Sequence, residues 1–251
     1  LRPNTKKDYE LCWVQLKPVF GDVPVCNIKP IHIRKYMDMR EAKKRANTER
    51  ILLKNILGYG YEYGWVESNA CDAVKPYKMK PREKYVTDAE YARMYESAPP
   101  TLQVIMELCY ICAARGQDIR ALRLDDIKED GLLVVQQKTG KKQLKLWNDR
   151  LRAAVEKAQG IRKEKLARTK HESMLLIVAQ GGHAYTQDGL TTIFQKAKYE
   201  GQDWSLHDLK AKGISDFEGD KQEFSGHKSR LMVERYNRSP DRVSVIDFPR
   251  K

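Results

Sequence analysis

The sequence lacks a long apolar run, and no stretch of about eighteen consecutive residues is hydrophobic. A transmembrane helix needs about 20 predominantly apolar residues, so we expect no membrane-spanning helix and no membrane partner. The first residues, LRPNTKKDYE, contain neither an initiator methionine nor the pattern of a signal peptide. We therefore expect a cytoplasmic protein whose natural chain extends further at its N-terminus.

Cysteine is scarce and unevenly spaced, with five residues in 251. An odd count in a long chain is typical of a reducing compartment and argues against a disulfide framework. Cys109 and Cys112 have the CxxC spacing, but no second pair completes a zinc site, so we expect buried thiols. No cluster of carboxylates is available to hold a metal, and no phosphate-binding glycine loop occurs. The sequence predicts no metal and no cofactor.

Positive charge, by contrast, is abundant, because 47 Lys and Arg face 34 Asp and Glu and leave a net charge of +13. Residues 1–80 carry +7 and the remainder +6, so the excess is spread over the chain. Such a distribution favours a polyanionic partner, most simply nucleic acid. A solvated basic surface without a partner remains the alternative.

The hydrophobic pattern divides the chain into two domains joined by a linker. Residues 1–76 show helical spacing, which predicts helices over 4–20, 29–46 and 47–65, the last with a cap at Asn47 or Thr48. Residues 77–84 are rich in lysine and contain proline, which is typical of an extended linker. Residues 85–251 form the second domain, with a tail over 239–251.

The second domain is predicted to be mainly α with a small antiparallel sheet, an α+β class. Thr87 and Glu90 have the spacing of a capping box at the start of a helix. The segments GLLVVQQ and QLKLW flank the turn KTGK and predict a β-hairpin. A further strand is expected over 174–179, MLLIVA, and helices over 101–114, 149–170, 186–201 and 204–219.

Several polar residues stand where they can do chemistry. Arg115 follows an apolar helix, where an arginine is costly unless it is paired, for example with Asp118, or presented to a phosphate. Lys138 lies at the tip of the hairpin; it is either an ordinary turn lysine or a proton donor. Ser205 and Asp208 form a second capping-box pattern, which places His207 in the first turn of a helix.

The last candidates are Lys210 and residues of the segment GHKSRLMVERYNR, which spans 226–238. Lys210 lies three residues after His207 on one helical face, and the two flank an N-terminus suited to anions. Ser229 is suited to cap a helix from Arg230, which leaves His227 in the preceding loop. Tyr236 falls late in that helix or just beyond it. Either it is an ordinary surface aromatic, or it is a nucleophile beside basic groups.

Together these motifs resemble the tyrosine recombinase, or phage integrase, family. The resemblance rests on ARGQDIRALRLDDI, a hairpin lysine, HDLK, GHKS and ERYNR, in this order and over residues 85–240. It implies that Arg115 clamps the scissile phosphate, that Asp118 supports Arg115, and that Lys138 protonates the leaving 5′-oxygen. It also implies that His227 donates to the phosphate and that Tyr236 is the nucleophile. His207 matches the histidine of the HxxR motif and, with the cationic site, activates the tyrosine.

One position departs from the family pattern, because Lys210 stands where a second arginine is usual. Lysine keeps the charge but loses the planar pair of donors, and the nearest arginine in sequence is Arg230. The expected function is site-specific DNA recombination through a 3′-phosphotyrosine, for integration or excision of a phage or mobile element. A catalytically weakened or inactive DNA-binding relative and a type IB topoisomerase-like enzyme are the alternatives.

The resemblance also implies partners. We expect double-stranded DNA attachment sites in a bacterial host cell, a homo-tetramer on DNA, and accessory proteins such as a DNA-bending factor and an excisionase. The helical domain resembles a core-site DNA-binding domain, and the segment 241–248 alternates like a strand that could pack on a neighbouring protomer. The basic residues expected to contact DNA are Lys43, Lys44, Arg45, Arg50, Lys78 and Lys80.

Overall fold

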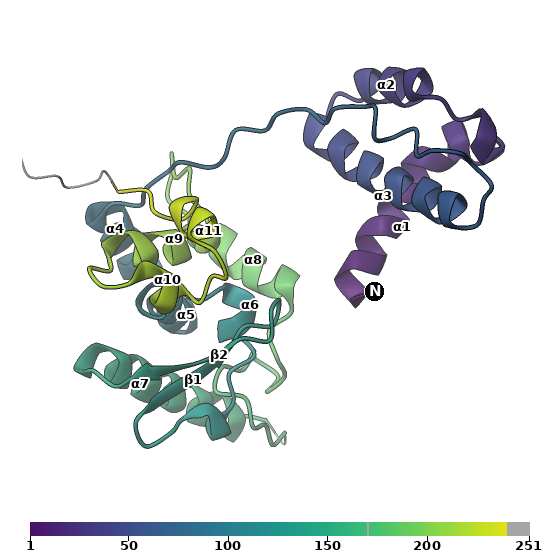
Figure 1. The fold of residues 1–251 in the computed structure, drawn as a ribbon. Helices are drawn as coiled ribbons and strands as arrows, with labels where there is room; N and C mark the ends of the chain where they lie inside the picture. Colours follow the sequence, from purple (N-terminus) through teal and green to yellow (C-terminus); the bar gives the residue numbers. More distant parts are fainter. Residues whose placement is uncertain (170, 240–251) are drawn as a thin grey trace, which may run out of the picture. The chain divides into compact units, whose positions relative to one another are not determined.

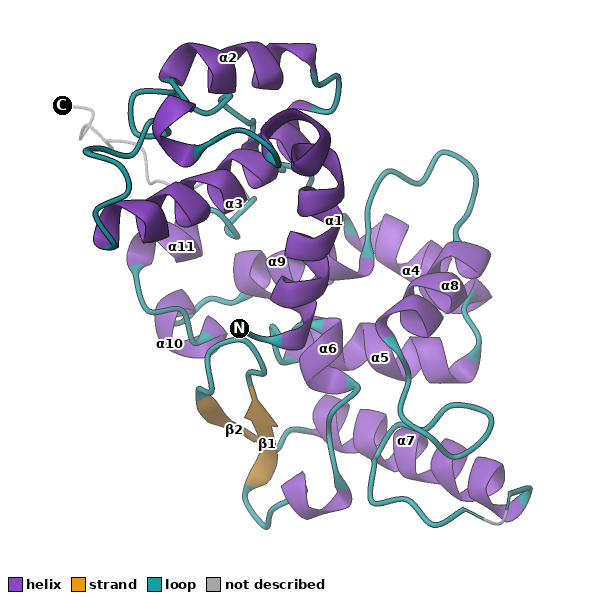
Figure 2. Cartoon of the chain, turned by 90° about the vertical axis from the view of Figure 1, so that its right-hand side faces the viewer, coloured by secondary structure: helices purple, strands orange, loops and turns teal. Residues whose placement is uncertain are grey.

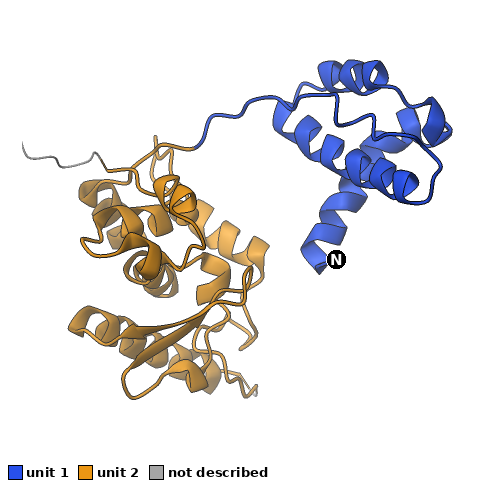
Figure 3. Cartoon of the chain, viewed as in Figure 1, with its two compact units in different colours: residues 1–81 blue, residues 82–251 orange. Residues whose placement is uncertain are grey.

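The computed structural model describes residues 1–169 and 171–239. The chain divides into two compact units, residues 1–81 and 82–251 (Figure 3). The division lies inside the segment 77–84 that the sequence predicts as a linker. The strand expected over 241–248 and most of the tail 239–251 lie outside the described residues. Among the described residues, no helix combines the length and the apolar character that crossing a bilayer requires.

The first unit consists of helices packed around one apolar core. Its elements are α1 (Pro3–Phe20), a short 3-10 helix (Val25–Asn27), α2 (Pro30–Met39) and α3 (Lys43–Glu62). Glu49 of α3 is completely buried, and its carboxylate accepts hydrogen bonds from Tyr36 Oη at 2.8 Å and Arg40 Nε at 2.9 Å. A buried charge needs such partners, so this contact fixes α2 against α3.

The helix expected over residues 29–46 is wrong in its extent. The chain leaves helical geometry at Arg40, whose φ of −79° and ψ of 117° are extended, and α3 starts at Lys43. The side chain of Arg40 reaches back to Glu49 instead of continuing the helix. Asn47, expected as a cap, lies inside α3, and its amide pairs with the backbone N–H and C=O of Tyr77, both at 2.8 Å. Contacts distant in sequence therefore override the local cap signal.

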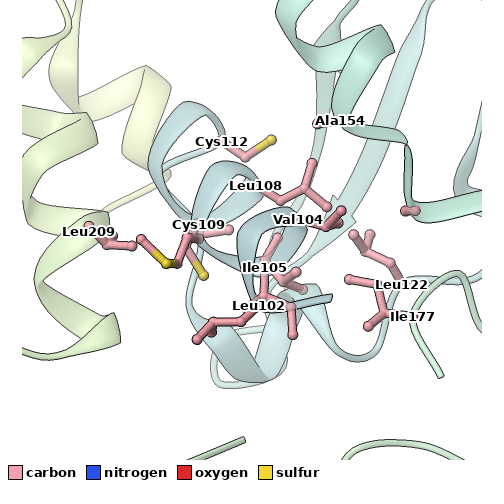
Figure 4. Packing of buried hydrophobic residues seen from close by; sticks show 14 of the residues in the cluster. Leu102, Val104, Ile105, Leu108, Cys109, Cys112, Leu122, Ala154, Ile177 and Leu209 are labelled. Carbon is pink, nitrogen blue, oxygen red and sulfur yellow. The ribbon is translucent and has the colours of Figure 1, made fainter. Parts of the chain in front are cut away.

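The second unit is built around α5 (Figure 1). Its elements are α4 (Asp88–Ser97), α5 (Pro100–Ile111), α6 (Gly116–Ile119), a short 3-10 helix (Leu124–Asp126), β1 (Gly131–Val135), β2 (Lys142–Leu146), α7 (Asp149–Ala167), α8 (Gln187–Ala197), α9 (Leu206–Asp216), α10 (Lys221–Ser225) and α11 (Arg230–Glu234). Figure 4 shows apolar side chains of α5 packed against Leu209 of α9 and Ala154 of α7. The predicted capping box at the start of α4 is confirmed, because the Glu90 backbone N–H donates to Thr87 Oγ1 at 3.2 Å and the Thr87 N–H donates to Glu90 Oε2 at 2.9 Å.

Close contact between α5 and α9 depends on a glycine. A Cβ atom at Gly213 would lie 2.1 Å from the backbone oxygen of Tyr110, a distance that no side chain can occupy. The glycine therefore lets α9 approach the backbone of α5 directly. This matters because α9 carries His207 and Lys210.

The sheet in the described part of the chain is a single antiparallel hairpin of β1 and β2 (Figure 2). Leu133 pairs with Leu144 at its centre. The fold class is therefore the predicted one, mainly α with a small antiparallel sheet. The strand expected over 174–179 is wrong, since only Leu175 forms an isolated bridge, to Arg123. Leu176 and Ile177 are buried in the core, so core packing without a ladder explains the apolar run.

Candidate active site

Tyr236 lies just beyond α11, with its ring between two histidines. Its Oη is 3.1 Å from Nε2 of His207. The ring of His207 meets it edge-on at 5.6 Å, and the ring of His227 stacks on it at 4.8 Å with an interplanar angle of 27°. The Nζ of Lys210 lies 5.8 Å from the centre of the phenol ring. The structure thus brings together four predicted residues that span 29 positions of sequence.

His207 is held by the predicted capping box at the start of α9. Asp208 accepts hydrogen bonds from the Ser205 backbone N–H at 2.8 Å and hydroxyl at 2.7 Å, which fixes the first turn of the helix. His207 lies at the surface, but its partial desolvation, with the nearby charge of Arg115, lowers the pKa of the imidazole. A neutral imidazole at pH 7 can accept the proton of the Tyr236 hydroxyl through Nε2.

Lys210 is completely buried beneath the tyrosine. Its exposed fraction is 0%, and its Nζ has no hydrogen-bond partner in the described part of the chain. Burial lowers the pKa of this lysine to about 7, and the positive charges of Arg115 and Lys145 add to the effect against the opposing charge of Asp118. A buried, unpaired ammonium group is costly in a folded protein, so it is suited to receive an anion.

Arg115 is presented by the turn that begins α6. Its Nη1 is buried without a hydrogen-bond partner and lies 3.9 Å from Oδ2 of Asp118. The same Oδ2 accepts the Arg115 backbone N–H at 3.3 Å, while Oδ1 accepts the backbone N–H of Gln137 at 2.8 Å. Asp118 therefore fixes Arg115 and also anchors the hairpin beside Lys138.

Lys138 lies in the exposed turn between β1 and β2. Its side chain makes no hydrogen bond or ion pair with the described residues, so the structure does not bring it into contact with the other candidates. Its role remains a prediction. Another hairpin lysine, Lys141, is near enough for its charge to act on His227.

His227 is positioned by side chains of the hairpin. The hairpin donates to backbone oxygens at the end of α10: Gln136 to Ser225 at 3.0 Å and Lys145 to Phe224 at 2.5 Å. Gly226 then turns the chain with a φ of 68°, which favours glycine.

The protonation of His227 suits a hydrogen-bond donor. Its Nδ1 lies 2.8 Å from the Ser225 hydroxyl, while Nε2 is buried without a partner. Burial and the charge of Lys210 lower the pKa to about 4, so the ring is neutral at pH 7. In the tautomer in which Ser225 donates to Nδ1, the proton is on Nε2, which can then donate to a ligand.

Three buried donors of the candidate residues lack a hydrogen-bond partner in the described part of the chain: Arg115 Nη1, Lys210 Nζ and His227 Nε2. A fourth, Nε of Arg238, belongs to the residue two positions after the tyrosine. The charges of Arg115 and Lys210 both lower the pKa of His227, and the charge of Arg115 lowers that of Lys210, which places the three residues in one site. The arrangement is suited to bind an oxyanion next to a hydroxyl nucleophile. Within the described residues, no three His, Cys, Asp or Glu side chains gather as metal ligands would.

Sequence reasoning missed Arg238, two residues after the tyrosine. Its Nη1 donates to Oδ1 of Asp208 at 2.6 Å, and its side chain is 7% exposed. It also missed Lys145, which β2 directs toward α10. Neither residue had a local signal, because each partner lies at least 30 positions away in the chain.

The basic residues expected to contact DNA differ in how free they are. Arg45 pairs with Asp8 at 2.6 Å, Arg50 donates to the Cys71 oxygen at 2.5 Å, and Lys43 donates to the Asp38 oxygen at 3.1 Å. The exposed ones are Lys44, Lys78 and Lys80. The structure gives the first group structural roles, and DNA contact by any of the six remains a prediction.

Comparison with known proteins adds independent findings. The model of the phage integrase family matches residues 84–242. The integrase of Escherichia phage HK022 is 24% identical over 262 residues, which cover 96% of this chain and 72% of the relative. Solved structures share the fold. A lambda integrase dimer bound to a COC′ core site has a TM-score of 0.81 and 21% identity, and the match covers 98% of this chain and 94% of that one. A lambda integrase tetramer bound to a Holliday junction has a TM-score of 0.80 and 20% identity, and the match covers 98% of this chain and 75% of that one.

Proposed function

The chain belongs to the phage integrase family, and we propose that it is a tyrosine site-specific recombinase that breaks and rejoins DNA through a covalent bond to Tyr236. The observation that carries the assignment of the nucleophile is the 3.1 Å contact between Tyr236 Oη and His207 Nε2, beside three unpartnered buried donors. A phenol attacks a phosphodiester only when its proton is removed, and the neighbouring imidazole can accept it.

The cleavage step follows from these positions. The Oη of Tyr236 attacks the scissile phosphorus and forms a 3′-phosphotyrosine, while its proton passes to Nε2 of His207. The bond from phosphorus to the 5′-oxygen breaks, and this oxygen takes a proton from Lys138 as general acid. The phosphodiester bond energy is kept in the protein–DNA bond, so a 5′-hydroxyl can reverse the step and join a new strand without ATP.

The buried donors serve the phosphate. Charge builds on the non-bridging oxygens as the fifth bond to phosphorus forms, and fixed cations that are already in place stabilise it. Arg115 Nη1, Lys210 Nζ and His227 Nε2 are the groups for this task, because each of these atoms is buried and lacks a hydrogen-bond partner in the described residues. We propose that the reaction needs no divalent metal, since side chains supply the charge.

The first unit extends the same function to DNA recognition. We propose that residues 1–76 form a core-site binding domain, that 77–84 cross the DNA backbone as a linker, and that 85–251 carry catalysis. Contacts from Lys78 and Lys80 to phosphates would set position and salt dependence more than sequence choice. The fold shared with a lambda integrase tetramer on a Holliday junction supports a homo-tetramer on paired attachment sites. A DNA-bending factor and an excisionase are further proposed partners.

A suicide substrate tests the assignment. A duplex with a nick close to the cleavage position releases a short fragment after cleavage, so the covalent protein–DNA adduct accumulates. We expect an adduct that survives denaturation, persists in excess EDTA and is lost in Tyr236→Phe. Tyr185→Phe, which changes a tyrosine of the same unit outside the site, is the matched control and retains the adduct. An adduct that forms equally in Tyr236→Phe would refute the assignment of the nucleophile.

The inactive-relative alternative is not favoured. It depended on Lys210 in the place of a second arginine, and Lys210 still directs a cation toward the tyrosine ring. The topoisomerase-like alternative predicts relaxation of supercoiled DNA without a specific site. Recombination between two attachment sites on one plasmid distinguishes the two, because only a recombinase exchanges the flanking sequences.

A further inference from the structure

Asp208 connects three segments of the second unit through one buried carboxylate. Its side chain is 0% exposed. Oδ2 accepts the capping hydrogen bonds of Ser205 and lies 3.2 Å from Nη2 of Arg82, while Oδ1 accepts Nη1 of Arg238 at 2.6 Å. The start of α9, the segment that enters the second unit and the segment after the nucleophile therefore meet at one charge.

Arg238 is held at this point by more than the ion pair. Its Nη1 also donates to the backbone oxygen of Lys84 at 2.7 Å. Its backbone N–H donates to the hydroxyl of Ser215 at 2.7 Å, and the same hydroxyl donates to the backbone oxygen of Tyr236 at 3.2 Å. Residues 236–238 are thus tied to α9 near both ends of the helix, through Asp208 and Ser215.

Two adjacent contacts join the same two segments. His207 bonds Tyr236, and the next residue of α9, Asp208, bonds Arg238, two residues beyond the tyrosine. The first contact is exposed and is a single hydrogen bond. The second is buried and charged at both ends, and such bonds are shorter and stronger. The buried contact therefore determines where the exposed one can form.

We propose that Arg238 is a positioning residue, whose ion pair with Asp208 holds the hydroxyl of Tyr236 against His207 for attack within the same protomer. This inference rests on the proposed role of Tyr236 as nucleophile. It gives a role to a residue that the sequence motifs contain but to which they assign none, and it gives the segment after the tyrosine a task in cleavage. In this role Arg238 acts through Tyr236: its Nη1 is taken up by Asp208 and by the Lys84 oxygen, while its Nε is buried without a hydrogen-bond partner in the described residues.

The test measures single-turnover cleavage of the nicked duplex at saturating protein, with the dissociation constant for DNA measured separately. Arg238→Gln is expected to slow cleavage on the order of 100-fold, because a displacement of about 1 Å at the reacting atoms has an effect of that order. DNA affinity is expected to change less than about threefold, since the site still holds its other cations. Arg238→Lys, which can still pair with Asp208, is expected to recover at least about tenfold of the lost rate.

Arg235→Gln is the matched control. Arg235 is exposed one residue before the nucleophile, and its side chain has no partner within the described residues. Arg235→Gln removes one positive charge from the same segment, as Arg238→Gln does. It is expected to leave the cleavage rate within about twofold of that of the unchanged protein. An equal loss in Arg235→Gln and Arg238→Gln would overturn the inference, because it would indicate a general effect of charge.

A double-mutant cycle with His207→Gln separates positioning from a merely structural role. If Arg238 acts through the contact of Tyr236 with His207, then Arg238→Gln slows the His207→Gln protein less than about threefold. Independent, multiplying effects would overturn the inference. Should Arg238→Gln fail to fold, the pair Asp208→Asn with Arg238→Gln leaves no unpaired buried charge and takes its place in the cycle.

The outcomes also separate this inference from the proposed function. If the unchanged protein forms no adduct through Tyr236, the proposed function fails. If it forms the adduct and Arg238→Gln cleaves at the same rate, only the role of Arg238 fails.

Discussion

The buried ammonium group of Lys210 predicts that cleavage by this recombinase depends on pH in a way that one substitution removes. The pKa of Lys210 is lowered from 10.5 to about 7 by burial and by the charges of Arg115 and Lys145, with Asp118 and Cys109 opposing. The phosphate needs the charged form. Above pH 7 the free protein must therefore take up a proton before it can bind the transition state.

The magnitude follows from the titration. About nine tenths of Lys210 is charged at pH 6 and about 1% at pH 9, if its pKa is about 7. In Lys210→Arg the guanidinium stays charged throughout this range. The ratio of kcat/KM for Lys210→Arg to kcat/KM for the unchanged protein should therefore rise about 100-fold from pH 6 to pH 9. The ratio cancels the titration of shared groups that do not interact with residue 210. Lys145 is not one of these, because its charge acts on Lys210.

The assay is cleavage of the nicked duplex at DNA concentrations far below saturation. Lys210→Met, of similar length but without charge, is the second variant and should lose cleavage at every pH. A ratio that stays within about threefold across the range would refute the reasoning, because Lys210 would then be charged in the free protein at all these values of pH.

The same shift predicts the stability of the protein without DNA. A lysine whose pKa is lowered in the folded state is destabilising below about pH 7, and this cost disappears as the pH rises toward 10.5, since unfolding takes up a proton between these values. A lowering of about 3.5 corresponds to about 5 kcal/mol, at about 1.4 kcal/mol for each tenfold change in the ionisation constant. Lys210→Met should therefore raise the free energy of unfolding by several kcal/mol at pH 6 and by little at pH 10, as measured with urea.

Other substitutions test the remaining parts of the site. Lys138→Ala should slow cleavage of ordinary DNA by about 100-fold or more. It should not slow cleavage of DNA with sulfur in place of the 5′-oxygen, since a thiolate leaves without a proton. Equal losses of rate on both substrates would exclude Lys138 as the general acid. Gly226→Ala should lower the free energy of unfolding by about 2–4 kcal/mol, since its Cβ would lie 2.6 Å from Gln136 Nε2. Gly140 has a similar positive φ but no neighbour within 4 Å of its Cβ position, so Gly140→Ala should lower the free energy of unfolding by only about 1 kcal/mol. Equal losses in the two urea titrations would contradict the role of packing at Gly226. Cleavage should persist in excess EDTA, and its loss would point to a metal.

Local patterns predicted the fold where a single segment decides it. The capping boxes at Thr87 and Ser205 involve residues three positions apart, and the hairpin has its turn between two short strands, so both are readable from the sequence. The helix expected over 29–46 failed because Arg40 turns toward Glu49, and this contact has no local signature. The strand expected over 174–179 failed because a buried apolar run has the same composition with or without a partner strand.

The site shows the same division. The residue types of the motifs identified Tyr236, His207 and Arg115 as candidates, because their chemistry is specific to their positions. The sequence could not show that Lys210 is wholly buried, since burial depends on how closely α9 approaches α5. It also could not show Arg238 as the partner of Asp208, because ion pairs across 30 residues leave no pattern.

The order of the site residues along the chain has a genetic consequence. Tyr236 follows Arg115, His207 and His227, and it packs with Val233 in a small apolar cluster separate from the main core of the second unit. A chain terminated just before α11 would keep the residues of that core and the groups proposed to bind phosphate, yet it would lack the nucleophile and Arg238, the partner of Asp208. Such truncated proteins are expected to bind DNA without cutting it, and nonsense alleles near this point are expected to inhibit the intact protein.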